Sequence, residues 1–459
     1  MSDTIVAVST AAGTGGIAIV RVSGPQAVEV VSQCWRGKRI SEIESHTVHL
    51  GKIVSESGEL LDEVVLTCFR GPNSFTGEDT IELACHGSMW IQRELVGVLI
   101  RCGARPAEPG EFTQRAFLNG RMDLAQAEGV ADLIASSSRA AHRMALQQTS
   151  GAFSKKLSEL REQLIEFASL LELELDFSEE EVEFADRMRL KLLGKEIIRV
   201  MKRLADSYSS GRVLKDGLPV VIAGAPNAGK STLLNALLED DRAIVSDIPG
   251  TTRDVIEDTR EIDGVLFRFM DTAGLRDTKD EVERIGIGKA EEKLEKASII
   301  LWLVDMASDV TRQLQDIGLR IQGLQNAQHI ILRNKIDIVE RGADCVEMPI
   351  AAERDIETID ISAFNGTGLD ELKRVMHEIA LKSYNPEADL IVTNGRHYAA
   401  LLSGSESMHR ALEGLDSGLS ADFVAQDVRE TLHHLALLTG SITTPDLLIS
   451  IFSRFCIGK

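Results

Sequence analysis

The spacing of hydrophobic positions changes along the chain and divides it into stretches of different texture. Up to about residue 120, short β-prone runs such as TIVAV, GIAIVRVSG and EVVLTCF alternate with turns that contain glycine, proline and serine, a pattern typical of strands. From Leu124 the pattern becomes helical, and within KKLSELREQLIEFASLLELEL apolar residues recur at intervals of three and four. These residues are Leu157, Leu160, Leu164, Phe167 and Leu171. The pattern predicts helices as far as about Gly211.

A second change of pattern indicates an inserted domain. Strand-and-loop texture runs from Leu214 to about Lys382, and helical texture then returns to the end of the chain. Because the middle stretch separates two helical ones, we predict an N-terminal α/β domain (1–121), a helical domain built from 122–213 and 385–459, and an inserted α/β domain (214–384). The predicted fold class is therefore multidomain, with α/β and all-α parts.

Composition restricts the class of protein. The chain has 459 residues, of which 44% are hydrophobic and 26% charged, as in ordinary soluble proteins of several domains. We see neither an apolar run long enough to span a membrane nor the pattern of a signal peptide. The six cysteines provide no disulfide framework and no CxxC metal pair, so we expect a reducing, cytoplasmic compartment.

The charge balance restricts the partners. A net charge of −21 argues against broad, charge-driven binding of nucleic acid, because a phosphate backbone requires a basic surface. An RNA partner would therefore need local basic patches on this chain, or a second protein that holds much of the RNA.

The strongest chemical signal is a phosphate-binding loop. In PVVIAGAPNAGKSTLLNAL an apolar strand leads into Gly224-x-x-x-x-Gly229-Lys230-Ser231 and then into an amphipathic helix, which is the order that a P-loop requires. Glycines let backbone N–H groups approach phosphates, and the helix N-terminus adds positive potential. Lys230 is predicted to reach the β- and γ-phosphates, and the Ser231 hydroxyl to bind Mg²⁺.

Three further motifs follow in the order of a GTP-binding domain. FRFMDTAGL places Asp271 where it would hold Mg²⁺ through water, and Gly274 where its N–H would contact the γ-phosphate. In IILRNKID, the carboxylate of Asp337 can accept both N1–H and the 2-amino group of guanine, a pair of donors that adenine lacks. DISAFNGTG supplies Ser362 and Ala363 behind the base. Four motifs in this order predict a GTP-binding domain with a doubly wound sheet.

The four motifs do not identify the residue that orients the attacking water. Ras-like proteins carry a glutamine directly after Asp-x-x-Gly, but this chain has Leu275 there, which cannot orient water. The following loop offers Arg276, Asp280, Glu281 and Glu283. A glutamate acting through a bridging water is chemically reasonable, and a solvated loop carboxylate is the alternative for each acidic residue.

Several strings together closely resemble the MnmE (TrmE) family of tRNA modification GTPases, and the resemblance covers the whole chain. They are GAPNAGKSTLLNAL, SDIPGTTRDV, DTAGLRDTKDEVERIGI, PNSFTGEDTIELACHG, GEFTQRAFLNGRMDLAQAEGVADLI and the terminal FCIGK. The resemblance implies a homodimer, an N-terminal domain for tetrahydrofolate binding and dimerisation, and an inserted Ras-like G domain. The residues that motifs and resemblance together assign to GTP are Asn227, Ala228, Gly229, Lys230, Ser231, Thr232, Ser246, Asp247, Ile248, Pro249, Gly250, Thr251, Thr252, Asp271, Thr272, Ala273, Gly274, Asn334, Lys335, Asp337, Ser362 and Ala363.

The resemblance also implies metal ions and catalytic residues for GTP hydrolysis. The implied metal ligands are Asn227, Ser246, Ile248 and Thr251 for K⁺, and Ser231 and Thr252 for Mg²⁺. A monovalent cation beside the phosphates can replace the charge of an arginine finger. Glu283 matches the glutamate that positions water, and Lys230 is the catalytic lysine. The family often has alanine where this chain has Pro249, and proline should stiffen that loop.

A one-carbon site is implied for the N-terminal domain. Arg21, Glu82 and Arg121 align with contacts to a reduced folate, either 5-formyl- or 5,10-methylene-tetrahydrofolate, and Lys459 aligns with a C-terminal contact. A carboxylate can pair with the guanine-like donors of a pterin, and cationic side chains suit the carboxylated tail. The family ending places Cys456 near this site, where a thiolate with a lowered pKa would take part in one-carbon transfer. The alternative is a buried, inert thiol.

The reaction that the resemblance implies is the addition of an aminomethyl or carboxymethylaminomethyl group to C5 of the wobble uridine (position 34) of certain tRNAs, with ammonium or glycine as nitrogen donor. The partner is the flavoprotein MnmG (GidA), which carries FAD, uses NADH and forms a heterotetramer with the family. GTP hydrolysis would drive a conformational cycle. The alternatives are a GTP-switched ribosome-assembly factor, which would lack the folate-type N-terminus, and a free-standing folate-dependent transferase regulated by GTP.

Overall fold

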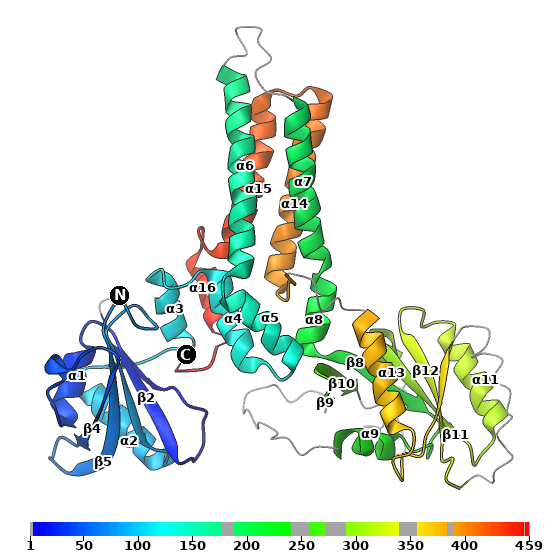
Figure 1. Cartoon of the computed structure of the whole chain (residues 1–459), viewed down its shortest axis with the longest axis horizontal. Coiled ribbons are helices and arrows are strands. Elements are labelled where there is room, and N and C mark those ends of the chain that lie inside the picture. Colours follow the sequence, from blue (N-terminus) through cyan, green and yellow to red (C-terminus); the bar gives the residue numbers. More distant parts are fainter. Residues whose placement is uncertain are drawn as a thin grey trace, which may run out of the picture. The chain divides into compact units, whose positions relative to one another are not determined.

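The computed structural model describes residues 3–176, 187–239, 257–270, 291–338, 356–382, 390–453 and 455–458 (Figure 1). Its backbone forms two compact units. The first unit contains Met1–Ile134, Ala145–Met201 and Ala400–Lys459, and the second contains Ala135–Met144 and Lys202–Ala399. The bounds of the four predicted segments, at residues 121, 213 and 384, stay a prediction.

The first unit begins with a seven-stranded sheet of order β3-β4-β5-β6-β2-β1-β7, antiparallel except for the pair of β1 with β7. Its elements are β1 (Ile5–Val8), β2 (Ile17–Ser23), α1 (Ala27–Cys34), β3 (Trp35–Arg36), a 3₁₀ turn (Ile40–Glu42), β4 (Thr47–Val54), β5 (Leu60–Phe69), β6 (Thr80–His86), α2 (Met89–Arg101) and β7 (Arg105–Pro106). Alternate strand residues such as Val20, Leu66 and Leu83 form a core with α1 and α2. This face of the sheet is therefore fully packed.

The opposite face of the same sheet carries polar and exposed apolar side chains. Ile17, Val48 and Leu50 are all more than half exposed. On the same face, Arg21 of β2 lies directly across from Glu82 of β6. Because strand side chains alternate between faces, this second face is free to bind something other than the helices.

The helical part of the first unit is a bundle of long antiparallel helices (Figure 1). The helices beyond the sheet are α3 (Glu111–Leu118), α4 (Leu124–Ala135), α5 (Arg139–Thr149), α6 (Ala152–Asp176), α7 (Arg187–Asp206), α14 (Gly395–Ser417), α15 (Ala421–Thr439) and α16 (Pro445–Phe452), and part of α5, α7 and α14 belongs to the second unit. The predicted apolar stripe from Leu157 to Leu171 is confirmed, because all of its members are buried in α6. Helix α6 packs on α15, and Gly194 of α7 packs closely on Leu412 of α14.

The second unit is a six-stranded sheet between two layers of helices. Its elements are α8 (Tyr208–Asp216), β8 (Leu218–Gly224), α9 (Lys230–Glu239), β9 (Glu257–Ile262), β10 (Val265–Met270), β11 (Ile299–Asp305), α11 (Val310–Ile321), β12 (Gln328–Asn334), β13 (Glu357–Asp360) and α13 (Leu369–Lys382). The strand order is β13-β12-β11-β8-β10-β9, and only β9 is antiparallel. Helices α9 and α13 pack on one face and α11 on the other.

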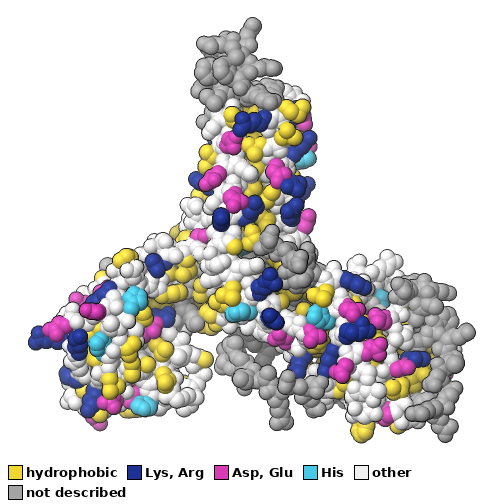
Figure 2. Space-filling model, viewed as in Figure 1, with side chains coloured by type: hydrophobic (Ala, Val, Ile, Leu, Met, Phe, Trp, Pro, Cys, Tyr) yellow, Lys and Arg dark blue, Asp and Glu magenta, His cyan; other side chains and the backbone are white. Residues whose placement is uncertain are grey.

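The predicted fold class is confirmed: an α/β N-terminal part, an all-α bundle and a doubly wound α/β domain. Among the described helices, none combines the length and apolar character needed to cross a membrane. On the face that Figure 2 shows, basic and acidic side chains are interspersed along the helical bundle. That mixture offers no broad basic surface there for a phosphate backbone.

A buried ionic cluster fixes the start of α3 against the N-terminal strands. Arg115 is almost completely buried and donates from Nη2 to Glu111 Oε1 and Asp3 Oδ1, both at 2.9 Å. Arg105 donates to both oxygens of Glu111, at 2.6 and 3.1 Å. A buried ion pair stabilises a fold only when its remaining atoms are also bonded, and breaking one partner leaves an unpaired buried charge.

The hydrogen bonds to Glu111 determine its titration. Burial by itself raises the pKa of this carboxyl, but hydrogen bonds from Arg105, the Glu108 N–H and Arg115 bring it below the ordinary value of 4.5. A carboxylate with a lowered pKa in the folded state stabilises the protein above its unfolded pKa. That contribution is lost as the pH falls through the lowered value.

We predict that Glu111→Gln lowers the free energy of unfolding of the first unit by about 3 kcal/mol at neutral pH, because the buried Arg115 and the partly exposed Arg105 each lose a carboxylate partner. The variant should also lose less of its melting temperature than the wild type between about pH 5 and pH 3, since the titrating group is gone. Thermal unfolding followed by circular dichroism measures both effects. The exposed Glu108→Gln is the control, and identical acid sensitivity in wild type and Glu111→Gln would refute the assignment.

Candidate functional site

The phosphate loop lies between the end of β8 and the start of α9. The loop begins at Gly224, where an added Cβ would lie 2.5 Å from the Leu303 carbonyl oxygen, so only glycine lets β8 end this close to β11. Asn227 and Gly229 have φ values of +62° and +100°. Left-handed residues in a loop turn successive N–H groups inward, and such a concave run of N–H groups binds anions.

Lys230 is the first residue of α9. Its ammonium group donates to the carbonyl oxygens of Gly224 and Ala225, at 3.0 and 2.9 Å. The side chain therefore folds back over its own loop, which places a positive charge at the mouth of the N–H cradle. Ser231 and Thr232 follow in the first turn of α9, and both are exposed. The helix N-terminus adds further positive potential at the same place.

Asn334 connects the phosphate loop to the loop behind the base. Its side chain is buried, its Nδ2 donates to the Ala228 carbonyl oxygen at 2.7 Å, and its Oδ1 accepts from the Ala363 N–H at 3.0 Å. A Cβ on Gly229 would lie only 2.5 Å from Asn334 Nδ2, so glycine is needed there too. The amide thus joins two loops that are 135 residues apart in the sequence (363 − 228).

The other residues of the base motif surround this bridge. Lys335 has φ +69° and forms an ion pair with Asp305 at 2.6 Å. Asp337 is exposed, as a residue that is to meet a ligand must be. Ser362 is fully buried, and Ala363 lies beside it. The structure therefore brings together Ala228, Asn334, Lys335, Ser362 and Ala363 at one end of the sheet.

The sheet topology explains why these loops meet. Strands β8, β11, β12 and β13 are parallel neighbours, so their carboxyl ends share one edge. Strands β11, β12 and β13 lie on one side of β8 in the sheet, whereas β10 and β9 lie on the other side. Ligands of open α/β sheets bind where the strand order reverses in this way, outside the carboxyl ends.

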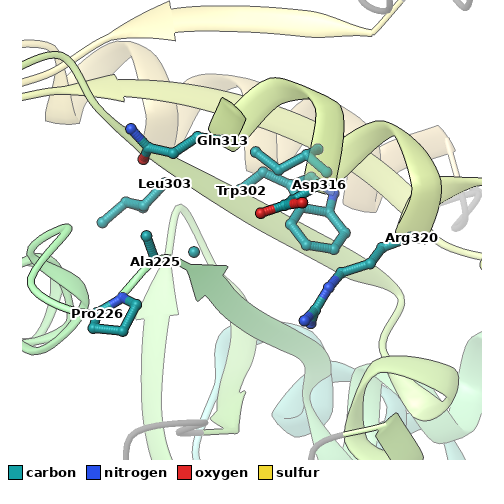
Figure 3. A pocket seen from close by; sticks show the side chains of 9 residues that line it. Ala225, Pro226, Trp302, Leu303, Gln313, Asp316 and Arg320 are labelled. Atoms are coloured by element: carbon teal, nitrogen blue, oxygen red, sulfur yellow. The ribbon is translucent and has the colours of Figure 1, made fainter. Parts of the chain in front are cut away.

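Two hollows lie near the nucleotide motifs, one beside the base loop and one beside the phosphate loop. One, of about 700 Å³, lies between α9 and the loop that contains Ala363 and Phe364. The other, of about 230 Å³, has Ala225 and Pro226 on one side and side chains of α11 on the other (Figure 3). The first lies within the size range of small-molecule pockets and can admit a purine nucleoside, whereas the second lies below that range.

Several predicted site residues lie outside the described residues. They are Ser246, Asp247, Ile248, Pro249, Gly250, Thr251, Thr252, Asp271, Thr272, Ala273, Gly274, Glu283 and Lys459. Of the implied metal ligands, Asn227 and Ser231 are described, and both are exposed in the phosphate loop and the first turn of α9.

A second candidate site lies on the N-terminal sheet. Arg21 donates to Glu82 Oε1 from both Nε and Nη2, at 2.9 and 2.8 Å, and both side chains are about four-fifths buried. The Arg21 guanidinium lies 5.6 Å from the ring centres of both Phe75 and Phe112. Aromatic faces stabilise a cation and hold its plane in place. Sequence reasoning missed the two phenylalanines, because they are far from Arg21 along the chain.

Arg121, the third predicted folate residue, is not joined to this pair. Its side chain is exposed and lies beside Gly77, where an added Cβ would come within 3.3 Å of Arg121 Cγ. Gly77 follows Phe75 by two residues, so Arg121 borders the same loop as the Arg21 cluster.

The C-terminal segment returns to the N-terminal domain. The Cys456 carbonyl oxygen accepts from the Gly110 N–H at 3.3 Å, and Gly458, with φ +95°, lies so close to Val8 that an added Cβ would be 2.1 Å from its carbonyl oxygen. Gly110 immediately precedes α3 and stands two residues before Phe112, whose ring contacts Arg21. The last residues are therefore held at the helix that also supports the Arg21–Glu82 pair.

The thiols of the described cysteines differ in access. Cys456 is exposed, whereas Cys34, Cys68 and Cys85 are buried. Burial raises the pKa of Cys34 to about 12 and that of Cys85 to about 11. A thiol reacts through its thiolate, so these two are inert at neutral pH. The alternative interpretation of Cys456 as a buried thiol is wrong, because the terminal residues pack through their backbone and leave this side chain exposed.

The fold and the loops at its carboxyl edge define the class: a P-loop protein with a doubly wound G domain and guanine-type base motifs. Comparison with known proteins identifies the family. A model of the MnmE helical domain matches residues 124–456, and a model of the GTP-binding protein TrmE N-terminus matches residues 4–121. The chain belongs to the MnmE family of tRNA modification GTPases.

Individual relatives agree over the full length. The tRNA modification GTPase MnmE of Cytophaga hutchinsonii is 50% identical over 459 residues, covering 100% of this chain and 98% of that protein. The protein of the same name from Christiangramia forsetii is 49% identical, with 100% of both chains covered. Among solved structures, Era in complex with MgGDPNP and a 16S ribosomal RNA fragment is 29% identical, covers 41% of this chain and 65% of its own, and has a TM-score of 0.29.

We predict that Asn334→Ala destabilises the second unit by about 2 to 4 kcal/mol, because it leaves the Ala228 carbonyl and the Ala363 N–H buried without partners. Urea unfolding followed through the fluorescence of the buried Trp302 measures the change. Asn235→Ala, which removes an exposed asparagine from α9, is the control and should stay within about 0.5 kcal/mol of the wild type. Equal unfolding midpoints for Asn334→Ala and wild type would contradict the bridging role.

Proposed function

We propose that the protein hydrolyses GTP and works in the modification of the wobble uridine of tRNA. The observation that carries the first half is the Asn334 bridge, which holds the phosphate loop and the guanine loop in one frame. A site that fixes both ends of a nucleotide binds it with little rearrangement, and preorganisation is a large part of affinity. For the remaining motif residues between Asn227 and Ala363 we propose the roles in binding GTP, Mg²⁺ and K⁺ that their motifs and the family resemblance imply.

The described residues support a specific division of labour in hydrolysis. Lys230 now bonds to two carbonyl oxygens of its own loop, and it would exchange them for β- and γ-phosphate oxygens when GTP enters. The exposed Ser231 hydroxyl, at the helix start, is an oxygen ligand of the kind that Mg²⁺ prefers. Mg²⁺ supplies charge neutralisation on the phosphates. We assign the positioning of the attacking water to Glu283.

Asn227 fits a role as a ligand for K⁺. Its left-handed backbone and its exposure at the phosphate loop present an amide oxygen next to the phosphate cradle. Amide and carbonyl oxygens suit hard cations. K⁺ supplies, when bound, the positive charge that an arginine finger supplies in other GTPases. Ser246, Ile248 and Thr251 complete the proposed ligand set.

We predict that GTP turnover is at least about tenfold faster in K⁺ than in Na⁺ at equal ionic strength, because the cation stabilises charge on the departing phosphoryl group. Asn227→Gly should lose this stimulation and retain GTP binding, since glycine keeps the positive φ while removing the amide. Release of inorganic phosphate measures turnover. Equal rates in the two salts for the wild type would refute the proposal for K⁺ and leave GTP hydrolysis itself intact.

The hydrogen-bonding groups of the N-terminal site suit a reduced folate. Both bonds from Arg21 end on Oε1 of Glu82, so Oε2 can accept from the amino and ring N–H groups of a pterin. The pair lies on the face of the sheet opposite α1 and α2, and about one-fifth of each side chain is exposed, which gives a flat ring an edge to reach. Arg121 and Lys459 are proposed to meet the carboxylated tail of 5-formyl- or 5,10-methylene-tetrahydrofolate. The folate supplies the one-carbon unit.

The proposed reaction needs partners. The exposed Ile17 of β2 and the exposed Val48 and Leu50 of β4 support a homodimer, because apolar side chains exposed on one sheet face favour burial against another surface. We propose that the flavoprotein MnmG, with FAD and NADH, joins this dimer in a heterotetramer in the cytoplasm. A net charge of −21 supports a division in which that partner holds much of the tRNA.

We predict that Cys456→Ser abolishes the wobble modification while GTP turnover stays within about twofold of the wild type, because Cys456 is held through its backbone at the start of α3 in the first unit, whereas GTP binding is assigned to the second. Mass spectrometry of wobble nucleosides from a deletion strain that carries the variant measures the modification. Cys102→Ser, which changes a half-buried thiol of the N-terminal domain, should modify normally. Normal modified tRNA with Cys456→Ser would show that this thiol is not catalytic.

A further inference from the structure

Phe364 is an exposed aromatic residue beside the proposed guanine site. Its side chain is 87% exposed, the highest exposure among the large hydrophobic residues of the described chain. An isolated apolar residue on a surface needs no explanation. Phe364, however, directly follows Ala363, whose N–H is held by Asn334, and its ring borders the hollow of about 700 Å³ next to α9.

The loop that carries Phe364 is rigid. Ser362 accepts from the Gly366 N–H through its carbonyl oxygen at 2.9 Å, and its own N–H donates to the Thr367 carbonyl oxygen at 3.0 Å. Asn365 Oδ1 accepts from both the N–H and the hydroxyl of Thr367, at 3.0 and 2.7 Å. Gly366 closes the turn with φ +83°. A tight turn closed by these hydrogen bonds therefore holds the ring in its exposed position.

The hollow has the walls that a purine requires. Thr232, Asn235 and Ala236 of α9 form one side, and Ala363 and Phe364 form the other. The hydrogen-bonding edge of guanine is assigned to Asp337 and the Ala363 loop, which leaves the two flat faces of the base to be covered. An aromatic side chain at this rim can cover one of them, since every base has a π-face on which such a ring stacks.

We infer that Phe364 stacks on the base of the bound guanine nucleotide and raises the affinity of the site without reading the identity of the base. The inference rests on the proposed binding of GTP. Its recognition chemistry is that of a flat purine ring system against an aromatic face. It predicts the same gain for any purine that reaches the hollow, while the choice of guanine stays with Asp337.

The experiment measures dissociation constants of GDP and of inosine diphosphate, which lacks the 2-amino group, by isothermal titration calorimetry on the full-length protein. Phe364→Ala is expected to weaken both nucleotides about tenfold, Phe364→Leu about threefold and Phe364→Tyr less than twofold, because stacking needs a ring. The ratio of the two constants should stay at its wild-type value in all three variants. Leu319→Ala, which truncates an exposed side chain of α11 in the same unit, is the control and should bind as the wild type does.

Two outcomes would overturn the inference. If Phe364→Ala binds GDP within twofold of the wild type, the ring does not contact the base. If that variant weakens GDP and leaves inosine diphosphate unchanged, Phe364 acts by placing Asp337 and does not stack. Failure of the wild type to bind GDP at all is a different result, because it refutes the proposed GTPase function itself.

Discussion

The G domain depends on one buried amide. Asn334 ends β12 and bonds to the phosphate loop with its nitrogen and to the base loop with its oxygen. Both ends of the amide are satisfied, so its burial costs little, whereas loss of either partner would leave a polar group unpaired. Two described features of the nucleotide site lie directly against this amide: Gly229, where an added Cβ would meet its nitrogen, and Ala363, which precedes Phe364 and donates to its oxygen. The distance between the phosphate and base halves is thereby fixed before any ligand enters.

The phosphate site reconciles an acidic protein with an anionic substrate. A net charge of −21 would repel GTP if binding relied on surface charge. The loop instead presents backbone N–H groups, a helix start and the single ammonium of Lys230, all of which act at short range. Backbone dipoles that are already oriented need no reorganisation, so a local positive potential can exist in a negatively charged molecule.

The N-terminal site is assembled from segments that are far apart in the chain. Arg21 and Glu82 meet because β2 and β6 are antiparallel neighbours, and Phe112 joins them from the start of α3. The buried cluster of Arg115, Glu111 and Arg105 holds that helix start in place. The last residues then dock on Gly110 and Val8, which brings Cys456 to the same helix. Stability of the ionic cluster and placement of the thiol are therefore linked.

The chain by itself determined the class of fold and the nucleotide motifs. Gly224 to Ser231 can be recognised because this short string imposes its own backbone geometry, with glycine or asparagine where φ is positive, and Asn334 to Asp337 because its side chains carry the base-recognition chemistry. The apolar stripe of α6 was equally plain, since its period of 3.6 is local. Only the tertiary structure decided that Asn334 bridges two loops, that two phenylalanine rings flank Arg21, and that the terminal glycine at 458 lies against Val8. Those contacts join residues tens to hundreds of positions apart, and no local pattern records them, because the pairing of distant segments is set by strand order and by packing of the whole core.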